Sequence, residues 1–112
     1  MKLNSLSLFQ TNNVERDFLA SINRAFSRFG DNKVNVVLHK FEDDYHLSGN
    51  DILDHPDFFS KTVQKIFRFG ASYVEKAMIS ELIEEFSLPQ GNYRELSDIV
   101  RAIKESEIAL VH

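Results

Sequence analysis

Apolar residues recur along the chain at intervals of three and four, the spacing that places side chains on one face of an α-helix. Four stretches show this pattern clearly and a fifth shows it more weakly, and they start at Val14, Val34, Phe59, Val74 and Leu96. Charged residues occupy the positions between the apolar ones. The pattern therefore predicts five amphipathic helices and an all-α fold.

Residues that cap or break helices mark the expected boundaries. Asn12, Ser72 and Asn92 each stand three residues before a glutamate, which is the spacing of a capping box. Pro56 suits the first turn of the third helix, where its missing N–H is no loss. The segment from Ser48 to Leu53 is compatible with one extra helical turn.

Glycines and short polar residues mark the other ends. All four glycines follow predicted helices, and we expect each to adopt the left-handed conformation that closes a last turn without a Cβ penalty. Asp31 or Asn32 is expected to cap the second helix.

The second half of the chain repeats the apolar pattern of the first half. Phe18, Ile22, Ala25 and Phe26 recur 41 residues later as Phe59, Val63, Ile66 and Phe67. We therefore expect a single helical domain over residues 12–112, with two tandem helix-turn-helix units at about 12–50 and 54–92 and a C-terminal helix over 93–107. These helices would pack as a compact four- to five-helix bundle. Residues 1–11 are expected to be an N-terminal arm, compatible with a flexible segment, a short strand or a segment ordered only by a partner.

Composition narrows the functional classes. Ten Phe against three Tyr and no Trp predict a core filled by apolar rings. The net charge of −4 offers no global positive field, and the second helix of each pair is acidic, so we expect no direct nucleic-acid binding. The chain lacks cysteine and an apolar run long enough for a membrane span or signal peptide, so we expect a cytoplasmic protein that contacts no membrane.

Two groups of residues are candidates for contacts with a protein partner or with a second copy in a homodimer. Lys61, Lys65 and Arg68 fall on one helical face, and the C-terminal tail carries Ile108, Leu110 and Val111. Phe58 and Phe59 are hard to place together in one apolar stripe, so they either pack in the core or form an exposed patch.

The charged residues follow a pattern of their own. Basic residues concentrate on the first and third helices and acidic residues on the second and fourth. These charges either set how the hairpins or two copies meet, or form solvated faces.

The main alternative function is metal or small-ligand binding. His39, Asp43 and His46 stand at spacings of four and three, which places imidazole and carboxylate ligands on one helical face. The same residues are also compatible with a plain polar stripe. Catalytic signatures are absent, because every glycine is assigned to a helix end and there is no cysteine nucleophile. We therefore expect no enzyme activity and no cofactor.

The segment from Val36 to Leu88 resembles a small archaeal helical family, the signalling output domains of Nitrosopumilus-type archaea. The similarity covers about two thirds of the chain, roughly residues 18–88, and is carried by its pattern at residues 38–47, 57–67, 70–71, 74–76 and 81–86. It implies a role in archaeal signalling, often beside sensor or regulator modules, and no catalytic residues. The sequence thus predicts a non-catalytic helical protein-interaction module of archaeal signalling or regulation.

Overall fold

The computed structural model describes the backbone of residues 2–111 and the side chains of residues 13–106. It is an all-α bundle, as predicted. Its elements are α1 (Lys2–Ser27), α2 (Lys33–Tyr45), η1 (Gly49–Asp51), α3 (Pro56–Phe67), η2 (Arg68–Gly70), α4 (Ala71–Phe86) and α5 (Leu96–Val111), where η1 and η2 are short 3-10 helices. In this described part of the chain, no helix has both the length and the apolar character needed to cross a membrane.

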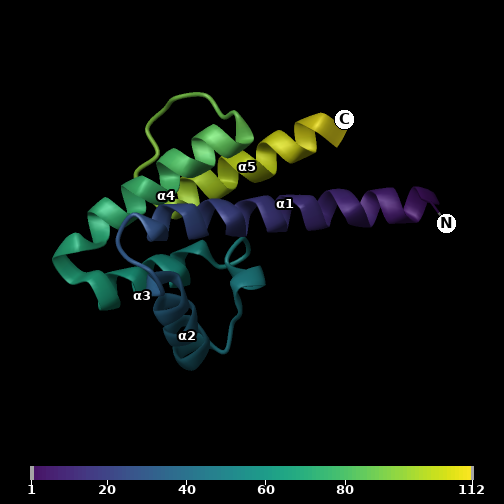
Figure 1. The fold of residues 1–112 in the computed structure, drawn as a ribbon. Coiled ribbons are helices and arrows are strands. Elements are labelled where there is room, and N and C mark those ends of the chain that lie inside the picture. The colour runs from purple at the N-terminus through teal and green to yellow at the C-terminus, as the bar shows by residue number, and fades with distance from the viewer. Residues whose placement is uncertain (1, 112) are drawn as a thin grey trace.

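The long helix α1 organises the bundle. In Figure 1, α4 and α5 lie along one side of α1, and α2 and α3 lie on the other side. The most extensive helix contact is that between α1 and α4, and α3 packs against α2, α4 and α5. The N-terminal end of α1 reaches beyond the other helices (Figure 1).

Phenylalanine rings fill the centre of the bundle. Phe59 of α3 lies between Phe26 of α1 and Phe41 of α2, with ring centroids 6.3 and 5.3 Å away and edge-to-face geometry at both contacts. All three rings are fully buried. Residues from α1, α4 and α5 complete the core, chiefly Phe18, Ile22, Met78, Leu82, Ile99 and Ile103. The Phe-rich core follows from the helical spacing of these residues.

Two helices have bounds that differ from the sequence prediction. Helix α1 begins at Lys2, so residues 2–11 continue the helix instead of forming a separate arm, and Asn12 lies in the helix interior. The physical reason is that residues 2–11 contain neither Gly nor Pro to break the helix. Helix α5 begins at Leu96 and not at residue 93, and Asp98 in its first turn accepts hydrogen bonds from the N–H groups of Arg94 and Glu95 at 2.9 and 3.1 Å. Its last residue is Val111, beyond the expected end at 107.

The left-handed residues are mostly not the predicted glycines. Among the described residues, Gly30 is the one glycine with a positive φ, at 128°. The other positive φ values belong to Asn32, His46, Arg68 and Ser87. The expectation was wrong because helices α2, α3 and α4 end three to five residues before the next glycine, so another residue makes the turn.

Of the remaining predictions of helix starts and caps, some are confirmed and others are wrong. Pro56 opens α3 and η1 forms the extra turn, which begins with a capping box between Ser48 and Asp51. Asn32 is the N-cap of α2, but its side chain makes no capping hydrogen bond. Ser72 lies inside α4, which begins at Ala71. Glu75, the glutamate expected to pair with Ser72 in a capping box, instead accepts hydrogen bonds from other helices.

Glu75 is a buried polar link among three helices. Its side chain is 9% exposed, and its Oε2 atom accepts hydrogen bonds from Ser60 Oγ of α3 and from the backbone N–H of Leu96, both at 2.8 Å. Leu96 is the first residue of α5, whose early N–H groups have no partner within their own helix. A side chain of α4 therefore fixes the start of α5.

We expect Phe59→Ala to lower the free energy of unfolding by about 3–5 kcal/mol, because it removes a fully buried ring and leaves a cavity. Urea denaturation measures this loss. Phe69→Ala is the matched control, because Phe69 is 98% exposed and its removal should change stability by less than about 0.5 kcal/mol. Equal losses for the two variants would contradict the described core.

Candidate interaction surface

Two large aromatic side chains are exposed where α3 turns into α4. Phe69, in η2, is 98% exposed, and Tyr73, in the first turn of α4, is 68% exposed. We call this pair the aromatic turn. The preceding residue, Arg68, has a φ of 52° and a ψ of −112°, a backbone conformation that residues other than glycine rarely adopt. The packed helices on either side thus hold a sharp turn that presents Phe69 to solvent.

A hollow of about 410 Å³ lies beside Phe69, and we call it the basic hollow. Arg68 of η2, Lys76 of α4 and Arg94 just before α5 bring three positive charges to it. None of the three forms an ion pair with any side chain that the structure describes. The other lining residues are Gln64, Phe69, Ala71, Ser72, Glu75 and Glu95. Of the two glutamates, Glu75 is already engaged with Ser60 and Leu96.

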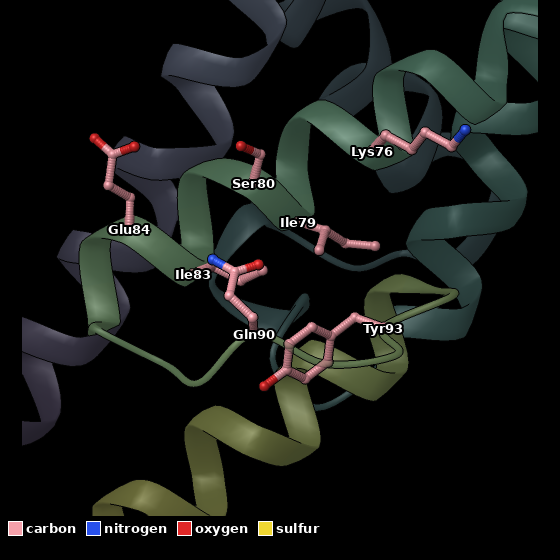
Figure 2. Close-up of a pocket in the computed structure, with 7 residues that line it drawn as sticks. All are labelled: Lys76, Ile79, Ser80, Ile83, Glu84, Gln90 and Tyr93. Carbon is pink, nitrogen blue, oxygen red and sulfur yellow. The ribbon is translucent and has the colours of Figure 1, made fainter.

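A second hollow, of about 320 Å³, lies between α4 and the loop that leads to α5. Figure 2 shows Gln90 and Tyr93 of this loop opposite Ile79 and Ile83 of α4. We call it the loop pocket. The Tyr93 hydroxyl donates a hydrogen bond to the Pro89 carbonyl at 2.7 Å, which ties the loop to itself. The polar lining residues are Lys76, Ser80, Glu84 and Gln90, and Lys76 also lines the basic hollow.

The predicted basic face on α3 is divided in the structure. Lys65 Nζ donates to Asp44 Oδ2 of α2 at 3.1 Å and lies 5.7 Å from the centre of the Tyr45 ring. Lys61 Nζ lies 6.0 Å from the centre of the Phe58 ring. Arg68 follows the end of α3, where the positive φ interrupts the helical row, and lines the basic hollow instead. Lys65 is thus engaged within the chain.

The adjacent pair Phe58 and Phe59 has two different environments. Phe59 is fully buried, whereas Phe58 is 36% exposed and stacks between two rings. Its centroid lies 4.6 Å from that of Tyr45 and 5.5 Å from that of His55, and both pairs are nearly parallel. One residue therefore serves the core and the other a surface stack.

Complementary charges join α1 to α4. Arg24 donates to Glu81 at 3.1 Å and to Glu85 at 2.8 Å, and Arg28 pairs with Glu81. The hydrogen bonds that Arg24 donates to Glu81 and Glu85 raise the pKa of Arg24 above its ordinary value, and the one to Glu81 has the larger effect. The basic and acidic helices noted in the sequence thus meet within one chain.

The candidate metal ligands are only partly brought together. His39 Nε2 lies 3.5 Å from Asp43 Oδ2 on α2. His46 is the left-handed residue that ends α2, so it leaves the helical row of the other two. Within residues 13–106, no three His, Asp or Glu side chains converge in a way that would hold a metal ion.

The side chains of Ile108, Leu110 and Val111 lie outside the described residues. The backbone there continues α5 to Val111. The structure therefore leaves the predicted role of the C-terminal tail as a prediction.

The sequence pattern does not reveal the aromatic turn, because Phe69 precedes Gly70 just as Phe29 precedes Gly30. Phe29 packs against Phe67 with ring centroids 6.3 Å apart, whereas Phe69 is exposed. Spacing gave no signal either, because Phe69 stands three residues after Ile66, an interval that also fits a core residue of a continuing helix.

Comparison of this chain with protein-family models, with curated proteins and with solved structures finds no match. The similarity to archaeal output domains accordingly stays a prediction.

The hydrogen bond from Lys65 holds the pKa of the Asp44 carboxyl below its usual value. We expect Lys65→Met to raise that pKa, as followed by an NMR titration of the Asp44 carboxyl carbon. Because the folded pKa is the lower one, the contribution of ionised Asp44 to stability is present above the unfolded pKa and is lost as pH falls through the folded pKa. Lys61→Met is the matched control and should leave the titration unchanged. An unaltered Asp44 pKa in Lys65→Met would refute this pairing.

Proposed function

We propose that this chain is a non-catalytic helical protein-interaction module that docks a protein partner through the aromatic turn. One observation carries the proposal: Phe69 is 98% exposed, although four other phenylalanines of the chain are fully buried. Isolated apolar residues are common on protein surfaces. Here, however, the exposed ring follows the unusual backbone of Arg68 and has Tyr73 in the next turn.

Docking at the aromatic turn would give a large binding free energy for the small surface area that it buries. An aromatic side chain buries about 150–250 Å² when it is fully covered. Aromatic residues that enter a partner's pocket often dominate the energy of an interface. Because η2 lies between two packed helices, the backbone that carries Phe69 is ordered before binding, which lowers the entropy cost of association.

A role in archaeal signalling or regulation belongs to the same proposal, and it draws its support from the resemblance of residues 36–88 to archaeal output domains. A docking module needs no catalytic group, in keeping with the lack of catalytic motifs in the sequence. A second copy of the chain and a different protein both remain partners that this function admits.

Site-specific photo-cross-linking tests the proposal. A photoreactive phenylalanine analogue at position 69 should give a discrete covalent adduct in cells of the native host, and mass spectrometry identifies the captured protein. With that partner purified, Phe69→Ala should weaken its binding at least about tenfold, which corresponds to about 1.4 kcal/mol. An adduct of twice the chain mass would identify a second copy.

Position 36 provides the matched control, because Val36 is an apolar residue that is 51% exposed on α2. The analogue at position 36 should give no discrete adduct. The proposal fails if position 69 yields no adduct, or if Phe69→Ala binds the captured partner as tightly as the wild-type protein.

A further inference from the structure

We infer that the partner is recognised through a short acidic segment with one large aliphatic side chain, which lies along α4 beside the aromatic turn. This inference rests on the proposed function and names the chemistry of its partner. The basic hollow would receive the carboxylates of the segment, and the loop pocket would receive its aliphatic side chain.

The two hollows form one continuous binding surface along α4. Ser72, Lys76, Ile79 and Ile83 are spaced by three and four residues, so they share one face of this helix. Val74, Met78 and Leu82 pack α4 into the core, and Ile79, which is 7% exposed, belongs to the same core and lies at the border of this face. Lys76 lines both hollows, which places them next to each other.

The length of this surface suits a short segment. Eleven residues separate Ser72 from Ile83, which corresponds to about 16 Å along the helix axis. An extended peptide of about five residues covers that distance. The loop pocket, at about 320 Å³, has room for a side chain and not for a folded element.

The positive charges of this surface favour an acidic segment of the partner. Arg68, Lys76 and Arg94 come from three different elements and have no ion-pair partner among the described side chains. Lack of an ion pair is not special to these three residues, because Lys33, Lys61 and Arg101 form none with the described side chains either. What distinguishes the basic hollow is that three cations gather at it against the carboxylates of Glu75 and Glu95, which leaves a local excess of positive charge in a chain of net charge −4 and complements an acidic partner.

The charges also give the segment a direction. Glu84 lines the loop pocket, at the end away from Arg68 and Arg94. Carboxylates of the partner therefore belong near Lys76, and the aliphatic side chain belongs near Ile79 and Ile83. Seven residues of helix separate Lys76 from Ile83, about 10 Å, so the acidic and aliphatic positions of the segment should lie about three residues apart.

Selection from a displayed library of random 12-residue peptides on the immobilised protein tests this inference. We expect the selected peptides to share an acidic pair about three residues from Leu, Ile or Met. A synthetic peptide of the shared sequence should bind less tightly when salt is raised from about 50 to 500 mM, because salt screens exposed charges. Replacing its Glu or Asp residues by Gln or Asn should remove that salt dependence.

Charge reversals on the protein locate the contact. Lys76→Glu and Arg94→Glu should each weaken binding of the peptide at least tenfold, as measured by isothermal titration calorimetry. Lys33→Glu is the matched control, because Lys33 is an exposed lysine at the start of α2, and it should change binding less than twofold. Circular dichroism of each variant checks that the fold is retained.

The inference is overturned if the selected peptides are neutral or basic, or if Lys76→Glu and Arg94→Glu bind the peptide like the wild-type protein. It is equally overturned if sedimentation shows that this face instead joins two copies of the chain, with an assembly that Lys76→Glu dissociates. These results leave the proposed function intact as long as cross-linking at position 69 still captures a partner. Loss of that cross-link, in contrast, removes the proposed function itself.

Discussion

A single buried side chain on α4 fixes the position at which α5 begins. Glu75 accepts one hydrogen bond from Ser60 of α3 and one from the first N–H of α5. A carboxyl group at the start of a helix satisfies an N–H that has no partner in the helix, and its negative charge is favoured there by the helix dipole. Because burying a carboxyl without hydrogen bonds is costly, α5 and α3 have to stay where they satisfy it.

The candidate surface depends on this contact. Arg94 and Tyr93 stand two and three residues before α5, so the position of Leu96 sets where the guanidinium and the phenol ring lie relative to α4. Arg94 lines the basic hollow and Tyr93 lines the loop pocket. On the other side of the bundle, the rings around Phe59 fix α3 against α1 and α2, and thereby the point from which η2 projects Phe69. Core and surface are two consequences of the same packing.

The sequence was sufficient for those features that depend on neighbours along the chain. Helical spacing gave five helices and the Phe-rich core, and Pro56 marked the start of α3 because proline fits a first helical turn. Features that depend on distant residues were missed. Glu75 and Leu96 are 21 positions apart, and nothing local distinguishes this glutamate from one that caps its own helix.

The same limit applies to the surface. Periodicity tells which residues share a face, but it does not tell whether the residue after a helix end turns inward, as Phe29 does, or outward, as Phe69 does. The basic face was misjudged for a related reason. Its helical row assumed that α3 continues through Arg68, whereas the left-handed turn there moves this side chain to the hollow beside α4.

Amide hydrogen exchange at Leu96 in Glu75→Ala tests the central role of this carboxyl most directly. A hydrogen bond to a charged group is worth about 1.5–3 kcal/mol, so the Leu96 amide should exchange at least about tenfold faster in this variant. Glu75→Gln, which keeps an acceptor oxygen, should restore much of the protection, and amides of α2 should be unaffected. Unchanged protection of Leu96 in Glu75→Ala would contradict the account, because the start of α5 would then be fixed by something other than Glu75.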